Sequence, residues 1–259
     1  MLHEDRTRAG SFGADADQYD RARPGYPGAM IDDLVADDPG DVLDVGCGTG
    51  IAGRLLARRG CRVLGVEPDP RMAVVARRFD MEVENARFED WRPKGRSFDL
   101  LVSGQAWHWV DPRQGAAKAG EVVAPGGRVG LFWNCGRHDP GMQAAFDAAY
   151  RRVGCEVDTH SVVLGHMGDD RFERATEGLQ SSARFGPVER RSYRWEKTYS
   201  RAEWLDQLPT HSDHRTLPPP RLKRLLDEVG QAIDSNGGSF TMHYDCVLLT
   251  AVRRGAAGG

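Results

Sequence analysis

The sequence lacks several features that would place a chain in a particular class. Its five cysteines are widely separated and form no C-x-x-C pair, which gives no basis for a zinc ribbon or a redox dithiol. No apolar stretch approaches the roughly 20 residues that span a bilayer, and the polar start has no apolar core of the kind found in secretory signals. The formal net charge of −3 does not favour a nucleic-acid binder. These absences lead us to expect a cytoplasmic protein with no membrane or nucleic-acid partner.

The composition supports a single domain with a substantial core. Hydrophobic residues make up 40% and charged residues 28% of the 259 positions, values that are ordinary for a folded globular chain. Residues 1–18 are polar and contain several glycines, and we expect them to be mobile. A single domain is then expected over residues 19–253, with a helical lid at residues 19–38 and a disordered tail at residues 254–259.

Short apolar runs alternate with helical patterns through the first half of the chain. The runs predict strands at residues 41–46, 61–68, 81–85, 98–104 and 127–134. Helices between strands are typical of βαβ units, and therefore of a mostly parallel sheet with right-handed crossovers. Beyond residue 135 the pattern changes. Residues 137–184 predict a helical insertion, and two further strands are expected at residues 187–197 and 240–252.

A glycine-rich turn after the first predicted strand is the most informative local pattern. Gly46, Gly48 and Gly50 open a predicted helix, so the backbone can turn tightly and approach a ligand without interference from Cβ atoms. Two cofactors fit such a turn. The spacing from Gly48 through Gly50 to Gly53 satisfies the dinucleotide fingerprint G-x-G-x-x-G, with Glu67 near the expected ribose-binding acid. This match keeps an NAD-linked oxidoreductase as an alternative.

The register of the turn and a nearby acid favour a different cofactor. In the dinucleotide fold the first glycine directly follows the strand, which here is Gly46, and that count places Ile51 where the third glycine is required. Asp44 also precedes the turn. A carboxylate at this point would repel a pyrophosphate but attract the ammonium group of an amino acid.

Several motifs, in the correct order, resemble one family. VLDVGCGTG resembles the first motif of class I S-adenosylmethionine-dependent methyltransferases, and VLGVEPDPRM, with its acid after the second strand, resembles their ribose-binding motif. FDLLVSGQAWHWVD and APGGRVGLFWN resemble the motifs of the fourth and fifth strands. YDRARPGYP and TYSRAEWLDQLPTHSDHRTL resemble the subgroup that includes trans-aconitate methyltransferase-like proteins. The resemblance spans roughly residues 12–253.

The resemblance implies a fold and a reaction. The fold is an α/β, Rossmann-like, seven-stranded and mostly parallel sheet with an antiparallel last strand, helices on both faces and a helical insertion after the fifth strand. The reaction is the transfer of a methyl group from S-adenosyl-L-methionine to a small organic acceptor, with oxygen as the favoured atom and S-adenosyl-L-homocysteine as the product. A protein that binds the cofactor without methyl transfer is an alternative. Both a monomer and a homodimer are compatible with the sequence.

The resemblance also implies which residues hold the cofactor. Asp44 and the glycine loop would bind the methionine part, and Glu67 would accept hydrogen bonds from both ribose hydroxyls, since an ionised carboxylate has two acceptor oxygens. Met72 would pack on the adenine, and Tyr19 with Arg23 would bind the cofactor's carboxylate. The full set of cofactor-binding candidates is Tyr19, Arg23, Asp44, Gly46, Cys47, Gly48, Gly50, Glu67, Pro68, Met72, Phe88, Glu89, Ser103, Gln105 and Ala106.

His108 is the candidate catalytic residue. It stands between Trp107 and Trp109 after the fourth predicted strand, at the edge where ligands bind in open α/β sheets. No second ligand lies three or four residues away, so we predict no metal site. His108 would either orient the acceptor or take its proton, and the alternative is a histidine that only shapes the pocket. The insertion and the loop around residues 210–217 would roof the acceptor site.

Overall fold

One sheet organises the computed structural model, which describes residues 2–4, 10, 12–155 and 170–255. The strand order is β3-β2-β1-β4-β5-β7-β6. Neighbouring strands from β1 to β5 are parallel, whereas β7 runs antiparallel to both β5 and β6. The strands are β1 (Asp41–Val45), β2 (Arg62–Glu67), β3 (Glu82–Asn85), β4 (Phe98–Gly104), β5 (Val123–Arg137), β6 (Glu189–Ser200) and β7 (Ser239–Val252). The mostly parallel, seven-stranded sheet with an antiparallel last strand is confirmed.

Helices and short 3-10 turns, labelled η, connect the strands. Those of the first half are η1 (Leu2–Glu4), η2 (Phe12–Asp15), α2 (Ala16–Ala22), α3 (Gly28–Leu34), α4 (Ile51–Ala57), α5 (Pro70–Arg77), η3 (Trp107–Trp109) and α6 (Pro112–Val122). Those of the second half are α7 (Pro140–Arg152), α9 (Asp170–Ser181), α10 (Arg201–Gln207), η4 (Leu208–Thr210), α11 (Ser212–Arg215) and α12 (Pro219–Ser235). The expected insertion supplies α7 and α9, while its residues 156–169 lie outside the described part of the chain.

Aspartate and proline together set where α5 and α6 begin. The Asp69 carboxylate accepts a hydrogen bond from the backbone N–H of Arg71 at 2.9 Å. Asp111 accepts from the backbone N–H groups of Arg113 and Gln114 at 3.0 and 2.8 Å. Proline follows each aspartate, at a helical position where its missing N–H costs no hydrogen bond. Both helices therefore start at defined points just beyond the carboxyl edge of the sheet.

Hydrophobic side chains fill both faces of the sheet, as expected for a chain with helices on both sides. On one face, Trp133 of β5 packs against Phe172 of α9. On the other face, Phe132 of β5 lies in a cluster with Ile31 of α3 and Leu56 of α4. Consecutive residues of β5 thus point to opposite faces, as the pleat of a strand requires.

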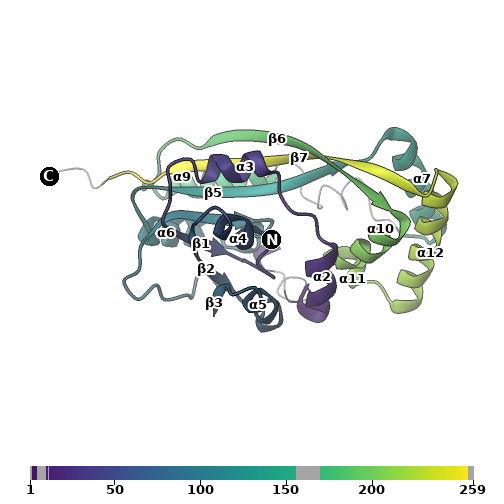
Figure 1. Cartoon of the computed structure of the whole chain (residues 1–259), viewed down its shortest axis with the longest axis horizontal. Coiled ribbons are helices and arrows are strands. Elements are labelled where there is room, and N and C mark those ends of the chain that lie inside the picture. The colour runs from purple at the N-terminus through teal and green to yellow at the C-terminus, as the bar shows by residue number, and fades with distance from the viewer. Residues whose placement is uncertain (1, 5–9, 11, 156–169, 256–259) are drawn as a thin grey trace.

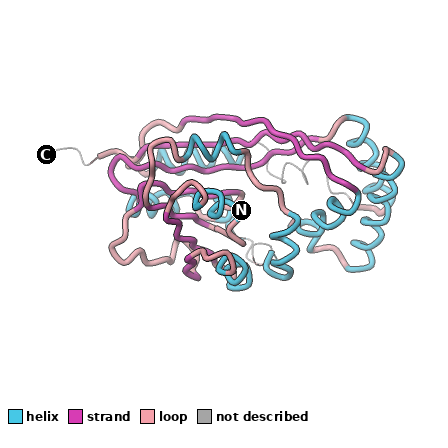
Figure 2. Tube along the Cα trace, in the orientation of Figure 1, coloured by secondary structure: helices cyan, strands magenta, loops and turns pink. Residues whose placement is uncertain are grey.

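A third hydrophobic cluster lies at the far end of the long strands β6 and β7. It includes Phe146 of α7, Tyr199 of β6, Trp204 of α10, Val229 of α12 and Phe240 of β7. In Figure 1 the helices α7, α10, α11 and α12 gather at this end, away from α4, α5 and α6. Figure 2 shows β5, β6 and β7 as long strands that run side by side toward these helices. The long strands therefore connect the parallel part of the sheet to an end of the molecule that is mainly helical.

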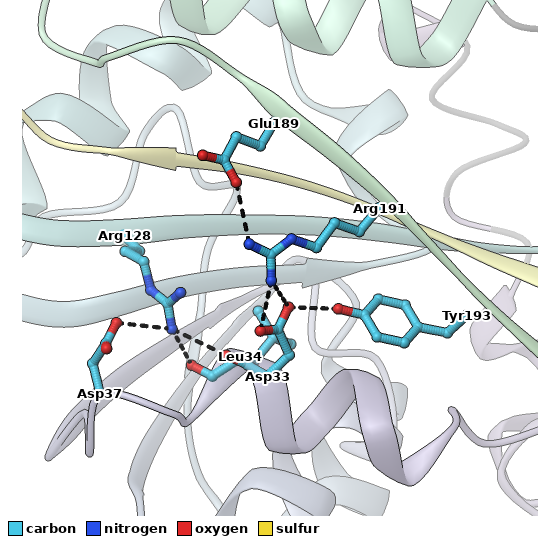
Figure 3. A network of polar contacts seen from close by, with 7 residues as sticks. All are labelled: Asp33, Leu34, Asp37, Arg128, Glu189, Arg191 and Tyr193. Carbon is cyan, nitrogen blue, oxygen red and sulfur yellow. Dashed lines mark hydrogen bonds and ion pairs between the residues drawn. The ribbon is translucent and has the colours of Figure 1, made fainter.

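A network of polar contacts fastens α3 to the sheet (Figure 3). Arg191 of β6 donates to both carboxylate oxygens of Asp33, at 2.8 and 2.9 Å, and the Tyr193 hydroxyl donates to the same group. Arg128 of β5 donates to the backbone carbonyls of Asp33 and Leu34, at 3.1 and 3.0 Å. These carbonyls lie in the last turn of α3, where a helix leaves acceptors unsatisfied. The network fixes the position of the segment that joins α2 to α3.

The N-terminal boundary differs from the expected one. The helix expected from residue 19 begins at Ala16, inside the segment expected to be mobile, and the 3-10 turn η2 precedes it. Asp15 caps this helix by accepting a hydrogen bond from the backbone N–H of Gln18 at 2.9 Å. The ring of Phe12 lies edge-on to that of Tyr19, with 6.0 Å between their centroids. A cap and one aromatic contact thus extend the regular structure beyond the apolar pattern.

Candidate active site

A cavity of about 540 Å³ opens at the carboxyl ends of β1, β2 and β4. This edge is where ligands bind in open α/β sheets, and the volume lies within the range of cofactor and small-molecule sites. The predicted residues that line it are Tyr19, Gly46, Gly48, Glu67, Pro68, Met72, Phe88, Glu89, Gln105 and Ala106. Most of the cofactor-binding candidates therefore surround one cavity.

The other predicted residues lie outside the lining of the cavity: Arg23, Asp44, Cys47, Gly50, Ser103 and His108. The Ser103 hydroxyl donates to the backbone carbonyl of Val45 at 2.8 Å and so ties β4 to β1. Gly50 adopts a left-handed φ of +85° and precedes α4, while Cys47 is buried under the turn. These three residues therefore support the glycine loop from outside the cavity lining.

The glycine loop leaves space that a side chain would fill. Gly46 has a φ of +67° and Gly48 a φ of +57°, both in the left-handed region that favours glycine. A Cβ atom on Gly46 would lie 2.5 Å from the Cβ of Ala106, which is far too close. The backbone of the turn and Ala106 therefore approach each other across the cavity only because Gly46 has no side chain.

Glu67 stands at the end of β2 with both oxygens held by the backbone. One oxygen accepts from the backbone N–H of Gly48 at 2.9 Å, and the other accepts from that of Asp69 at 2.8 Å. Burial raises the pKa of this carboxyl to about 7, although the two N–H donors counter part of the effect. Because each carboxylate oxygen has two lone pairs, the group can still accept two hydroxyl donors from a ligand.

Asp44 lies beneath the loop and is almost completely buried. Neither of its carboxylate oxygens has a hydrogen-bond partner of good geometry among the described residues, although the amide of Gly53 lies nearby. Burial raises the pKa of Asp44 to about 7; the amide of Gly53 offsets this only in part, and the negative charge of Glu67 adds to it. A buried carboxylate without an ion-pair partner is stabilised when a cationic group binds to it.

Phe88 and Glu89 line the cavity and also stabilise its wall. Phe88 is buried and packs against Trp107, with 6.0 Å between the ring centroids. One oxygen of Glu89 accepts from the side chain of Arg87 and from the backbone N–H of Asp111, both at 3.1 Å. The segment after β3 is thereby joined to the start of α6.

The N-terminal segment covers the cavity and was missed as a site element. Gly10 and Phe12 line the cavity, and Phe12 lies edge-on to Trp109 with 5.9 Å between the ring centroids. The side chain of Arg71 donates to the backbone carbonyl of Gly10 at 2.8 Å. One aromatic residue within a polar, glycine-containing stretch was the only signal of this role in the sequence.

The segment after β4 combines an unusual backbone with the candidate catalytic residue. Gln105 has a φ of +55°, a costly conformation that its side chain supports by donating to the carbonyl of Asn134 at 3.1 Å. The ring nitrogen Nδ1 of His108 accepts a hydrogen bond from the indole N–H of Trp133 at 3.3 Å. His108 is half-buried beside the cavity-lining Trp109, with 4.9 Å between the ring centroids. It thus stands at the rim of the cavity rather than in its wall.

Comparison with known proteins identifies the family. A methyltransferase domain matches residues 42–127. An uncharacterized methyltransferase of Mycobacterium tuberculosis is 30% identical over 249 residues, which cover 93% of this chain and 95% of the relative. The chain belongs to the class I S-adenosylmethionine-dependent methyltransferases. S-adenosyl-L-methionine is therefore the methyl donor of this enzyme.

Two further proteins are similar to this methyltransferase. The trans-aconitate 2-methyltransferase of Mycobacterium tuberculosis is 37% identical over 71 residues, or 27% of each chain. The crystal structure of the YcgJ protein of Bacillus subtilis matches with a TM-score of 0.54 at 18% identity, over 88% of this chain and 98% of that chain. The structural match supports the fold of the methyltransferase.

The residues around the cavity fit the methyl donor. The donor carries ribose hydroxyls, for which Glu67 in the lining offers acceptor oxygens, and an ammonium group, whose charge is opposite to that of the Asp44 carboxylate beneath the glycine loop, outside the lining. Among the described residues, none of the helices combines the length and apolar character needed to cross a bilayer. The same residues contain no group of three or more His, Cys, Asp or Glu side chains that could hold a metal ion.

Proposed function

We propose that this methyltransferase transfers the methyl group to an oxygen atom of a small organic acceptor. The hydrogen bond from Trp133 to His108 carries the proposal. A ring nitrogen that accepts a hydrogen bond bears no hydrogen, so the neutral His108 ring carries its proton on Nε2. An N–H donor at the rim of the cavity suits the lone pairs of an acceptor oxygen. A free amine needs no such donor.

The chemistry requires alignment more than it requires a strong base. When bound, S-adenosylmethionine supplies a methyl group on a positively charged sulfur, which keeps the bonding electron pair as the lone pair of the acceptor forms the new bond. Holding the acceptor in line with the methyl group is worth up to roughly 7–11 kcal/mol in well-oriented systems. We therefore assign His108 the role of orienting the acceptor. The relative named trans-aconitate 2-methyltransferase is in keeping with an organic acid as the acceptor.

The cofactor roles belong to the same proposal. Asp44 would bind the ammonium group, Glu67 would accept from the ribose hydroxyls, and Met72 would pack against the adenine. The glycine loop would follow the methionine part, because Gly46 and Gly48 line the cavity and carry no side chain that would keep a ligand from their backbone. The segment after β4, which carries His108, borders the same cavity through Gln105, Ala106 and Trp109.

The test compares His108→Ala with His108→Gln, using whichever member of a panel of hydroxy, carboxylic and amino acids the wild-type enzyme methylates. Loss of the Nε2–H donor should lower kcat/KM about 10–100-fold, the equivalent of about 1.5–3 kcal/mol for a hydrogen bond to a charged group. His108→Gln keeps an N–H donor and should recover part of the rate. Calorimetric titration with S-adenosylhomocysteine should give the wild-type affinity for both variants. An unchanged rate for His108→Ala, or products methylated only at nitrogen, would refute the proposal.

A further inference from the structure

Two arginines beside the N-terminal helix differ from the other arginines near the active site. The others pair with described carboxylates: Arg21 with Asp206, Arg54 with Asp20, Arg71 with Asp69 and Arg87 with Glu89. Arg23 and Arg215 form no ion pair with any residue in the described part of the chain. Both side chains are half-buried, and a guanidinium that is partly withdrawn from water without an ion-pair partner is costly.

Arg23 follows α2 and crosses to the helical end of the molecule. One terminal nitrogen, Nη2, donates to the backbone carbonyl of Thr210 at 2.8 Å. Its guanidinium also lies over the ring of Tyr19, 5.0 Å from the ring centroid. The Nε atom is buried and has no hydrogen-bond partner among the described residues. Arg23 therefore lies next to a residue that lines the cofactor cavity, and its Nε–H has no acceptor among the described residues.

Arg215 approaches the same place from the end of α11. Its Nη2 makes only a long contact of 3.5 Å to the backbone carbonyl of Asp15, at the start of α2. Its Nε atom is also buried without a partner among the described residues. Burial lowers the pKa of Arg215; the negative charge of Asp15 raises it in part, and the positive charge of Arg23 lowers it. Arg23 follows α2 and the Arg215 side chain reaches the residue that caps α2, so both side chains lie against the same helix.

Apart from Asp15, whose charge acts on Arg215, the groups described next are polar but uncharged. Burial holds the pKa of His211 well below its usual range, and the charge of Arg23 adds to this effect. The Tyr199 and Tyr244 hydroxyls bond to each other at 2.8 Å. Gln207 is buried, and its Oε1 has no partner among the described residues. None of these side chains supplies the negative charge that two arginines require.

We propose that Arg23 and Arg215 bind a carboxylate group of the methyl acceptor. A guanidinium presents a planar fork of N–H donors that matches the two oxygens of a carboxylate. Neither arginine lines the cofactor cavity, whereas Tyr19, over whose ring Arg23 lies, does. We therefore assign the pair to a carboxylate of the acceptor, in place of the cofactor carboxylate that the resemblance implied for Tyr19 and Arg23. The inference rests on the proposed function and narrows it to small organic acids.

Calorimetry at low ionic strength tests the site in the whole protein. The enzyme is saturated with S-adenosylhomocysteine and then titrated separately with acetate, succinate and benzoate. Wild-type protein should bind at least one of these carboxylates, and Arg23→Met and Arg215→Met should each weaken that binding at least tenfold. Arg21→Met is the matched control, because its guanidinium already pairs with Asp206, and it should bind like the wild type. Arg23→Lys keeps the charge and should retain part of the affinity. It replaces Arg23→Met in the comparison if Arg23→Met is poorly folded.

The outcomes separate the two possible sources of the carboxylate. Suppose Arg23→Met weakens binding of S-adenosylhomocysteine tenfold but not binding of 5′-methylthioadenosine, which has no carboxylate. The site then serves the cofactor, and the inference is wrong. Carboxylate binding that is absent from wild type, or equal in all variants, also overturns it and leaves oxygen methylation standing. Methylation of nitrogen in an acid that still needs both arginines would instead refute the proposed function and keep this site.

Discussion

The two ends of the active site carry charges of opposite sign, buried at one end and half-buried at the other. At the cofactor end, Asp44 and Glu67 are buried carboxylates that form no ion pair with a described residue. At the opposite end, Arg23 and Arg215 are cations with the same lack of a described counter-charge. Burial of each charge costs free energy in the ligand-free protein. The difference teaches that the ligands, rather than the protein, are expected to complete the charge balance at both ends.

The ends also differ in how they are built. The cofactor end is made of backbone turns and short side chains that follow one another along β1 and β2. The other end is made of long side chains from segments far apart in the sequence, brought together where α2 packs beside α10 and η4. We therefore expect ligand binding at the first end to depend mainly on close approach to the backbone, and ligand binding at the second end to depend mainly on charge.

Gly46→Ala should have the largest effect and would sharpen this contrast. An alanine here must adopt the left-handed φ of Gly46, which costs roughly 1–2 kcal/mol. Its Cβ also overlaps Ala106, which adds a packing cost of roughly 1–3 kcal/mol. We expect the free energy of unfolding in urea to fall by about 2–5 kcal/mol in total. Gly60→Ala is the control, because Gly60 also has a positive φ of +91° but open space around it. Equal losses for both variants would show that the close approach to Ala106 is unimportant.

A change of pH should affect the cofactor end and leave the other end nearly unchanged. The pKa values of Asp44 and Glu67 are raised to about 7, so both carboxyls are largely protonated at pH 6 and ionised at pH 8. The cofactor's ammonium and hydroxyl groups need the ionised forms, so its binding tightens as pH rises and releases protons. Calorimetry should show S-adenosylhomocysteine binding at least tenfold tighter at pH 8 than at pH 6, with about 1.4 kcal/mol for each tenfold change.

The matched variants locate the source of this pH dependence. Glu67→Gln and Asp44→Asn each remove one titrating group and should flatten the profile. Carboxylate binding at the opposite end should change little over the same range, because the pKa of His211 is well below its usual value and this ring stays neutral. A cofactor affinity that is constant, or that weakens as pH rises, would contradict the assignment of the two carboxylates.

Arg128→Met should have the smallest effect and should spare both ends. The variant loses the donors to two carbonyls at the end of α3, and we expect the free energy of unfolding to fall by about 1 kcal/mol. Arg62→Met is the control, since Arg62 pairs with Asp41 on the surface and should contribute no measurable stability. Affinity for S-adenosylhomocysteine should not change in either variant. Weaker cofactor binding in Arg128→Met would mean that the α3 network also positions the site.

Patterns among consecutive residues predict most of the fold and most of the cofactor end of the site. The alternation of apolar runs and helical patterns predicts the sheet, because strand and helix periodicities are properties of consecutive residues. The glycine turn and the acid after β2 predict the cavity for the same reason. The positions of Gly46 and Glu67 relative to each other follow from two neighbouring parallel strands.

The rest depends on contacts between segments that are distant in the chain. The approach of Arg215 to Arg23 joins residues far apart along the sequence, and no spacing pattern marks it. The hydrogen bond between Trp133 and His108 depends on how the η3 turn faces β5. Phe12 was not predicted because a single aromatic residue in a polar stretch has no periodicity.

The placement of β7 between β5 and β6 has a consequence for the order in which the protein assembles. As the chain leaves the ribosome, β6 is made before β7, yet in the finished sheet β6 pairs only with β7 among the described strands. During synthesis β6 therefore waits, with its backbone donors and acceptors unpaired, until α10, α11 and α12 have followed it. The sheet closes only when residues 239–252 insert between its two neighbours. A chain that stops before β7 would leave β6 with no strand to join.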